Sequence, residues 1–169
     1  MRRTLFYPLL MVSAFMLFLL SGCAKIRPVW TDLKSSFKSE EQPLSTLEQT
    51  RKRYSCAQGD TRFFVEKSDI IPSQVEPGDK IKHVVQYAFC APSDSVTLQG
   101  MVSRKIKFKG KERKITSEAE TETFKAGVWT FTAYIEVPDN APDGVYTLET
   151  IIRFEDKQIK RSGVFTVRD

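Results

Sequence analysis

The sequence predicts an all-β fold, a seven-stranded antiparallel sandwich that occupies residues 57–169 as one domain. From Asp60 onward, apolar and polar residues alternate with a period of two, which gives each segment one buried and one exposed face. Turn-forming residues interrupt the alternation about every ten to fifteen residues. No segment with helical periodicity separates the strands, and strands that follow one another directly favour an antiparallel sandwich.

The predicted strands are joined by short turns, of which Pro77-Gly78-Asp79 and Ala91-Pro92-Ser93-Asp94 are the clearest. They cover residues 62–71, 80–91, 95–109, 112–124, 128–137, 145–155 and 158–168. The inward-facing positions are apolar, and those expected in the core include Ile81, Val85, Tyr87, Phe89, Val96, Leu98, Val102, Ile106, Phe108, Trp129, Phe131, Ala133, Ile135, Tyr146, Leu148, Ile152, Phe154, Ile159, Phe165 and Val167. The 12 Phe residues of the chain support a well-packed core.

A short helix is predicted over residues 43–56, before the first strand. Ser45 and Glu48 have the spacing of a capping box, with Ser45 as the N-cap. One face of this helix would carry Leu44, Leu47, Arg51 and Tyr54. We expect that face to pack on the edge of the domain; contact with a partner is the alternative.

The first 22 residues have the three parts of an export signal. Arg2 and Arg3 give a positively charged start, an apolar run extends from Leu5 to Leu20, and two small residues precede Cys23. The run is 16 residues long, whereas a membrane-spanning helix needs about 20. A signal peptide is therefore favoured over a transmembrane anchor.

The segment Leu20-Ser21-Gly22-Cys23 resembles the lipobox of bacterial lipoproteins. This resemblance implies that residues 1–22 are a signal peptide removed by cleavage, and that Cys23 carries lipid such as palmitate, which holds the protein stably at a membrane. Ala24 follows the cysteine, and by the same resemblance this residue favours the outer membrane, with the domain facing the periplasm. Residues 23–42, with Pro, Ser and mixed charge, would form the tether.

Two cysteines, Cys56 and Cys90, remain once Cys23 is assigned to the lipid. In the oxidising compartment that an exported domain reaches, an even pair usually forms a disulfide. A hairpin folded around Val75 would bring both residues to the same end of the first two strands. A metal site with His83 or a catalytic cysteine is disfavoured, because metal-ligand spacing and an orienting partner for the histidine are both missing.

A predicted corner at residues 138–144 precedes the sixth strand. The corner ends at Gly144, and Tyr146 follows two positions later, near the start of the strand. This pattern resembles the corner between strands E and F of immunoglobulin-like and fibronectin-type modules, where the Tyr hydroxyl bonds to upstream backbone. The resemblance covers residues 60–169 and implies an immunoglobulin-like sandwich. Leu148 stands where antibody domains have their second inter-sheet cysteine, and a transthyretin-like topology is the alternative.

The most charged stretch of the chain is an expected hairpin at residues 104–114. Its cations are Arg104, Lys105, Lys107, Lys109, Lys111, Arg113 and Lys114. They would either bind lipid phosphates, an anionic glycan or an acidic protein surface, or protect exposed strands from association as solvated side chains. The carboxylates of Glu118, Glu120 and Glu122 are expected on one exposed strand face, which suits neither acid–base catalysis nor calcium binding.

The net charge of the chain and its lack of known catalytic motifs narrow the range of functions that we expect. The net charge of +5 falls to +3 without residues 1–22, which is too weak to indicate nucleic-acid binding. No GxSxG, HExxH, P-loop or dinucleotide motif is present, so we expect no enzyme activity, metal or cofactor.

We therefore expect an envelope lipoprotein, bound to the membrane through Cys23, that acts as a non-enzymatic adaptor and binds a protein partner. The alternative function is a ligand- or inhibitor-type module. It would recognise an anionic glycan, a lipid or a protease through the hairpin at residues 104–114 or the corner at residues 138–144.

Overall fold

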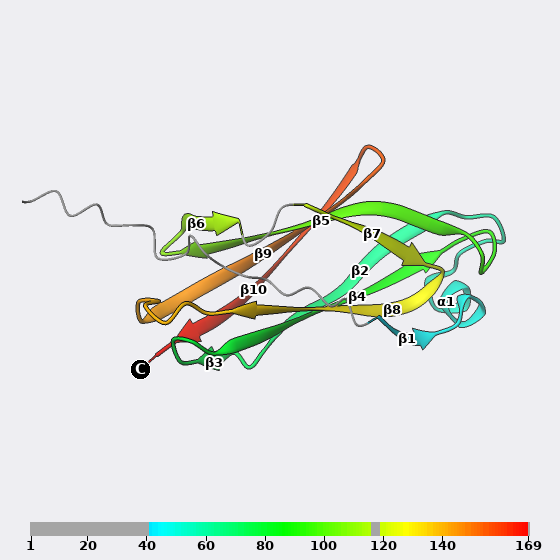
Figure 1. Cartoon of the computed structure of the whole chain (residues 1–169). Helices are drawn as coiled ribbons and strands as arrows, with labels where there is room; N and C mark the ends of the chain where they lie inside the picture. The colour runs from blue at the N-terminus through cyan, green and yellow to red at the C-terminus, as the bar shows by residue number, and fades with distance from the viewer. Residues whose placement is uncertain (1–40, 116–118, 169) are drawn as a thin grey trace, which may run out of the picture.

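The computed structural model describes residues 41–115 and 119–168, with the backbone alone for residues 111–115. Over these residues the chain forms two β-sheets and one short helix, α1 (Leu47–Tyr54), which confirms the predicted all-β sandwich. The strands run along the long axis of the molecule, with α1 at one end and the last described residue at the other (Figure 1).

The smaller sheet has four antiparallel strands in the order β1-β8-β4-β2. Their bounds are β1 (Gln42–Ser45), β8 (Gly127–Glu136), β4 (Lys80–Cys90) and β2 (Arg62–Ile71). The larger sheet has the order β3-β10-β9-β5-β6, and β7 also pairs with β5. Its strands are β3 (Gln74–Val75), β10 (Lys157–Val167), β9 (Gly144–Phe154), β5 (Thr97–Phe108), β6 (Lys111–Ile115) and β7 (Glu120–Lys125).

The predicted count of seven strands is wrong, because the described residues contain additional strands. The expected strand at residues 112–124 is two strands that pair with different parts of β5: β6 with residues 105–108 and β7 with residues 97–102. The short strands β1 and β3 were not predicted. Since β1 begins at Gln42, the last residue of the expected tether belongs to a sheet.

The core is divided into two apolar clusters by a layer of polar side chains. One cluster, which includes Leu47, Tyr87 and Phe124, lies toward the α1 end. The other, which includes Ile135 and Tyr146, lies toward the opposite end. The side chains of this layer are those of Ser68 on β2, His83 on β4, Arg104 on β5 and Thr150 on β9, which are joined by hydrogen bonds. Most of the apolar residues predicted to face inward are in these clusters.

The helix begins later than predicted, and its cap is a different pair of residues. Thr46 is the N-cap, and it forms a complete capping box with Gln49. The sequence fits this motif twice, since Ser45 and Glu48 have the same spacing. Pairing of β1 with β8 continues through Ser45, so the chain can enter the helix only after that residue.

The predicted disulfide between Cys56 and Cys90 is present, with a Cα–Cα distance of 6.4 Å. It joins the segment after α1 to the end of β4. Within α1, Arg51 donates to the carbonyl oxygens of Ala91 and Pro92, directly after Cys90, at 2.6 and 2.7 Å. The helix is thus tied to the end of the sandwich by a covalent bond and by hydrogen bonds.

Candidate functional site

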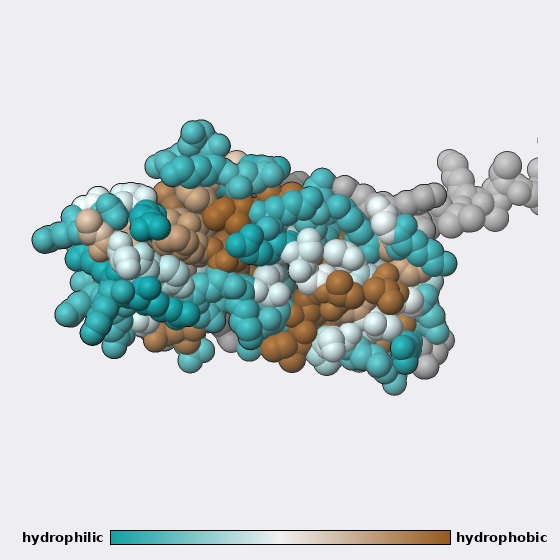
Figure 2. Space-filling model, turned by 180° about the vertical axis from the view of Figure 1, so that it is seen from behind, coloured by the Kyte–Doolittle hydropathy of each residue, from teal (hydrophilic) through white to brown (hydrophobic). Residues whose placement is uncertain are grey.

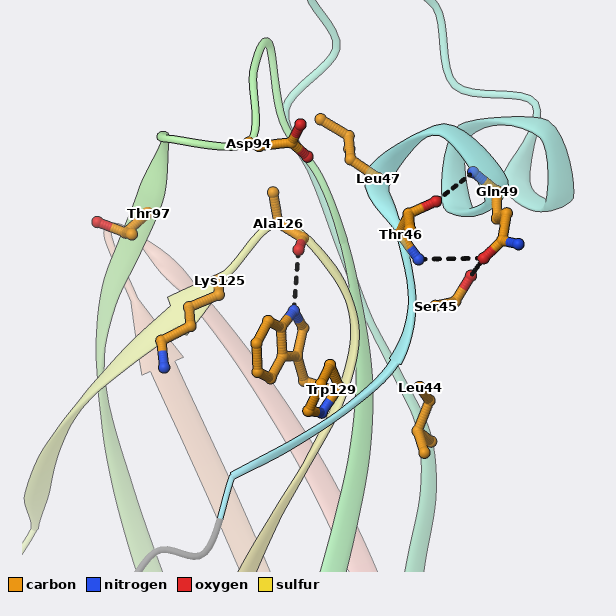
Figure 3. Close-up of a pocket in the computed structure, with 11 residues that line it drawn as sticks. Leu44, Ser45, Thr46, Leu47, Gln49, Asp94, Thr97, Lys125, Ala126 and Trp129 are labelled. Carbon is orange, nitrogen blue, oxygen red and sulfur yellow. Dashed lines mark hydrogen bonds between the residues drawn. The ribbon is translucent and has the colours of Figure 1, made fainter.

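An open groove of about 690 Å³ lies at the α1 end of the molecule. The indole of Trp129 lies between β1 on one side and Lys125 and Thr97 on the other (Figure 3). The lining residues are Pro43, Leu44, Ser45, Thr46, Leu47, Gln49, Asp94, Thr97, Lys125, Ala126 and Trp129. The lining thus combines five apolar residues with six polar or charged ones, and apolar atoms make up most of its exposed surface.

The position of Trp129 is fixed by contacts on two sides. Its Nε1 donates to the carbonyl oxygen of Ala126 at 2.9 Å. The Lys125 ammonium lies 4.9 Å from the ring centroid and also forms an ion pair with Glu41. Gly127 has a φ of 107°, a backbone conformation that favours glycine. Its lack of a side chain also lets β1 lie close to β8, because a Cβ there would be 2.5 Å from the Ser45 carbonyl oxygen.

Among the described residues that line the groove, no arrangement for acid–base or nucleophilic chemistry is found. Asp94 is its carboxylate and Lys125 its amine, and the amine is already paired with Glu41. A preformed aromatic surface with polar rim groups is instead suited to holding an apolar side chain of a ligand or protein.

A second cluster of functional groups is buried in the polar layer of the core. Arg104 Nε donates to His83 Nδ1 at 3.3 Å. The opposite ring nitrogen, Nε2, lies 3.0 Å from Ser68 Oγ and 3.3 Å from Thr150 Oγ1. Because the guanidinium can only donate, Nδ1 accepts and a neutral ring carries its proton on Nε2.

Burial changes the protonation of this cluster. Desolvation, with a smaller contribution from the charge of Arg104, lowers the pKa of His83 to about 3, so the ring is neutral at physiological pH. Desolvation also lowers the pKa of Arg104 to about 10, while the charges of Glu120 and Glu122 act in the opposite direction. Arg104 therefore stays charged, and its guanidinium lies 3.7 Å from Glu120.

Arg104 is not at the surface with the other cations of the hairpin, and Glu120 and Glu122 do not lie on a fully exposed face, so both predictions are wrong for these residues. Arg104 is only 1% exposed. Glu120 and Glu122 are partly buried, and desolvation raises the pKa of each carboxyl although the charge of Arg104 acts against the rise. Glu118 lies outside the described residues. A signal for the buried arginine was present, because position 104 alternates with the inward-facing Val102 and Ile106.

The expected basic patch is less positive than its sequence suggests. Lys107 and Lys160 both pair with Glu149, at 2.8 and 2.6 Å. Burial raises the pKa of Glu149, but the hydrogen bonds and charges of the two lysines outweigh it and hold the pKa below its usual value. Lys105 and Lys109 belong to the same hairpin, and Lys109 lies over the Phe108 ring. The side chains of Lys111, Arg113 and Lys114 lie outside the described residues.

The expected tyrosine corner is present at the other end of the molecule. The hydroxyl of Tyr146 donates to the carbonyl oxygen of Pro142 at 2.7 Å. Gly144 has φ of 145°, and a Cβ there would lie 2.7 Å from the Phe108 ring. These contacts explain why the corner needs a glycine followed two residues later by a tyrosine.

The remaining predicted site residues are placed as follows. Cys23 lies outside the described residues. His83 contacts polar side chains of the core, and no group of three or more His, Cys, Asp or Glu residues that could hold a metal occurs in the described part of the chain. No helix in residues 41–115 or 119–168 is long and apolar enough to cross a membrane.

On the face opposite to that seen in Figure 1, hydrophobic residues form patches among polar ones (Figure 2).

No protein-family model and no curated protein matches this chain. Among solved structures, the alkylpurine DNA glycosylase AlkC of Pseudomonas fluorescens, bound to DNA with an abasic site analogue, has 15% identity and a TM-score of 0.49. The sporulation control protein Spo0M of Bacillus subtilis has 10% identity and a TM-score of 0.42. The CARDB domain of the PF1109 protein of Pyrococcus furiosus, in complex with di-metal ions, has 13% identity and a TM-score of 0.45.

These similarities extend over different shares of the chains. They cover 73%, 66% and 64% of this chain, in the same order. They span 34% of the glycosylase, 50% of the sporulation protein and 89% of the CARDB domain. This chain thus matches about a third of the first protein and half of the second.

Proposed function

We propose that this chain is a lipid-anchored, non-enzymatic lipoprotein of the bacterial envelope that binds a partner protein through its β-sandwich.

 The observation that carries this proposal is the segment Leu20-Ser21-Gly22-Cys23 at the end of an apolar run. The Cys56–Cys90 disulfide supports it, because such bonds persist in oxidising compartments. In this proposal the domain faces the periplasm from the outer membrane.

We further propose that the sandwich is immunoglobulin-like. β2, β4 and β8 follow the order of strands A, B and E of such domains, and β10, β9, β5 and β7 follow the order G, F, C and C′. The bond from Tyr146 to the Pro142 carbonyl oxygen supports the same assignment. Domains with this architecture commonly bind other proteins, and this step rests on analogy of fold.

The groove at the α1 end is the surface that we assign to the partner. Its occupant would be an apolar side chain on an extended segment of a partner protein, packed against Trp129. Leu44, beside the groove, is 49% exposed, which leaves an apolar side chain available at the rim. The basic hairpin is a weaker candidate, since Arg104 is buried and Lys107 is paired with Glu149.

Anchoring is tested by palmitate labelling and membrane fractionation of the wild type and Cys23→Ala. The wild type should incorporate label and sediment with outer membranes, while Cys23→Ala should remain unlabelled and be retained in the inner membrane or released. Labelling of both proteins, or of neither, would contradict the lipid anchor.

Partner binding is tested by crosslinking in cells with the full-length protein. Leu44→Asp places a charge at the groove, and Val145→Asp is a matched control, since Val145 is a similarly exposed apolar residue at 59%. A partner crosslinked by the wild type and by Val145→Asp, but lost with Leu44→Asp, supports the groove. Equal loss with both variants, or with neither, would exclude it.

A further inference from the structure

Several polar groups that line the groove at the α1 end are already used by the fold. The hydroxyl of Thr46 accepts a hydrogen bond from the backbone N–H of Gln49 at 3.3 Å. Oε1 of Gln49 accepts from the backbone N–H of Thr46 at 3.2 Å and from Ser45 Oγ at 3.0 Å. These bonds hold the capping box of α1 in place. A ligand that used the same atoms would compete with the helix cap, so these residues are poor candidates for recognition.

The cation of the groove is also occupied. Lys125 forms an ion pair with Glu41, and its ammonium lies 4.9 Å from the centroid of the Trp129 ring. An acidic residue of a partner would gain little at this ammonium, because it would have to displace Glu41. Lys125 therefore helps to fix the ring and does not select the charge of the occupant.

Asp94 is the charged residue of the lining that remains available. Among the described residues, its exposed carboxylate forms no ion pair and no hydrogen bond. Asp94 lies in a turn closed by the N–H of Val96, which donates to the carbonyl oxygen of Ser93 at 3.2 Å. The hydroxyls of Ser93 and Ser95 lie 2.9 Å apart and bond to each other. The carboxylate is thus free to meet a ligand.

The turn that carries Asp94 is anchored at its base. Arg51 of α1 donates to the carbonyl oxygens of Ala91 and Pro92 at 2.6 and 2.7 Å. These two residues directly follow Cys90, which is bonded to the segment after α1. A turn held in this way loses little backbone freedom when a ligand binds, which favours recognition.

The order of these groups along the groove separates an apolar contact from a charged one. Ala126 lies between Asp94 and the indole of Trp129 (Figure 3). The groove therefore presents an aromatic surface at one end and a carboxylate at the other. Such an arrangement attracts a cation and repels an anion beside the apolar contact.

The charge of the groove is opposite to that of the chain. The whole chain has a net charge of +5, with 26 Lys and Arg residues against 21 Asp and Glu residues. An acidic partner, which the net charge would attract, is disfavoured at a groove whose available charge is negative. The local charge therefore indicates a basic occupant.

We propose that the partner segment combines an apolar residue, which packs against Trp129, with a nearby lysine or arginine, whose charge meets Asp94. The inference rests on the proposed function, since it specifies the occupant of the same groove. A single exposed ion pair contributes little free energy, whereas burial of an apolar side chain contributes more. The apolar contact thus supplies most of the affinity, and the cation selects among apolar segments.

Short peptides test this charge preference directly. The probes are glycine peptides that carry Leu and Lys, Leu and Glu, or Lys without Leu, with one glycine between the two side chains and in both orders. Each is titrated into the full-length protein at low salt, and the indole N–H signal of Trp129 is followed by NMR. Because the chain has two Trp residues, Trp30→Phe identifies that signal.

Two charge reversals complete the test. Asp94→Lys reverses the charge at the groove. Asp143→Lys is the matched control, because Asp143 is an exposed carboxylate in the corner at the other end and its replacement changes the net charge by the same amount.

We expect the peptide with Leu and Lys to bind the wild type and Asp143→Lys at least threefold more tightly than the peptide with Leu and Glu. Asp94→Lys should reverse this order, a result that misfolding cannot produce. About 1 M salt should remove the preference, because exposed charges are then screened. Equal binding of the two peptides by the wild type, or the same order in Asp94→Lys as in the wild type, would overturn the inference and leave the groove as an apolar site.

Other results would reject the groove itself, and this inference with it. One is binding of the peptide without Leu as tightly as the peptide with Leu and Lys. Another is a Trp129 signal that responds to none of the peptides. A Trp129 signal that shifts with protein concentration alone would overturn the inference in favour of a second copy of this chain as the occupant.

Discussion

At the scale of single residues, Arg104 is the most unusual member of the core, since its charged side chain is only 1% exposed. Removing an ion from water costs several kcal/mol, and this cost is offset only by well-placed partners. Arg104 has such partners on both sheets: His83 accepts a hydrogen bond, Glu120 supplies a charge at 3.7 Å, and the Phe131 ring lies 5.8 Å from the guanidinium. The arginine therefore links the two sheets through the polar layer.

Replacing Arg104 should separate the effect of its charge from that of its volume. Arg104→Ala removes the link and leaves a cavity, so we expect a loss of about 3 kcal/mol in the free energy of unfolding. Arg104→Met fills much of the space without a charge and should lie within about 1.5 kcal/mol of the wild type. Urea denaturation measures both variants. A larger loss for Met than for Ala would contradict this account.

His83 should make the stability of the domain depend on pH. The unfolded histidine titrates near 6.5 and the folded one near 3, so between these values the unfolded state binds more protons and stability falls as the pH falls. Between pH 7.5 and pH 5.5 the loss due to this group should be about 1.4 kcal/mol.

The matched control for that measurement is His83→Gln, which cannot titrate in this range. Each protein is unfolded by urea at both pH values, and the change with pH is compared within each protein. The wild type should lose more stability than the variant on acidification. The same loss in both proteins would show that His83 is not the group responsible.

At the scale of secondary-structure elements, the sequence predicted the long strands better than the short ones. The alternation in β4, β5, β8 and β9 extends over ten or more residues, so their existence and inward faces were evident. β1 has four residues and β3 has two, too few for a period to be recognised. These strands are defined by pairing with distant residues, and that pairing has no local signal.

The groove could not be predicted for the same reason. Its lining comes from three separate parts of the chain, at residues 43–49, 94–97 and 125–129. β1 brings the first and third parts together, and a hydrogen bond between Thr130 and Gln42 joins residues 88 positions apart. The buried cluster is also non-local, since His83 and Thr150 are 67 positions apart. Trp129 was predicted as a core residue, and it does pack against the core while also lining the groove.

The cap of α1 gives a prediction that distinguishes the two possible capping boxes. Thr46→Ala removes the hydroxyl that accepts a hydrogen bond from the backbone N–H of Gln49. This loss should lower the free energy of unfolding by about 1 kcal/mol. Ser45→Ala removes only a hydroxyl that donates to the Gln49 side chain, so its effect should be smaller. Thermal and urea unfolding of the two variants measure the difference, and a larger effect of Ser45→Ala would contradict the observed cap.

At the scale of the whole molecule, the α1 end carries both the groove and the disulfide. The groove, the disulfide and the start of β1 all lie there, with β3 and the last described residue at the opposite end (Figure 1). The helix contributes Leu47 to the first apolar cluster, while the segment after it is joined to β4 through Cys56. The lining of the groove therefore depends on α1 remaining docked on the sandwich.

The disulfide should stabilise the whole domain and also preserve the groove. Cys56 and Cys90 are 34 positions apart, and closing a loop of that length lowers the entropy of the unfolded chain by an amount equivalent to about 4 kcal/mol. Cys56→Ser with Cys90→Ser should therefore reduce the free energy of unfolding by roughly that amount, measured by urea denaturation without reductant. Because α1 precedes Cys56 directly, hydrogen exchange in residues 47–54 should increase more than in β9, which lies in the centre of the other sheet. An equal increase in both elements would mean that the bond stabilises the domain as a unit and has no special role in holding the helix that lines the groove.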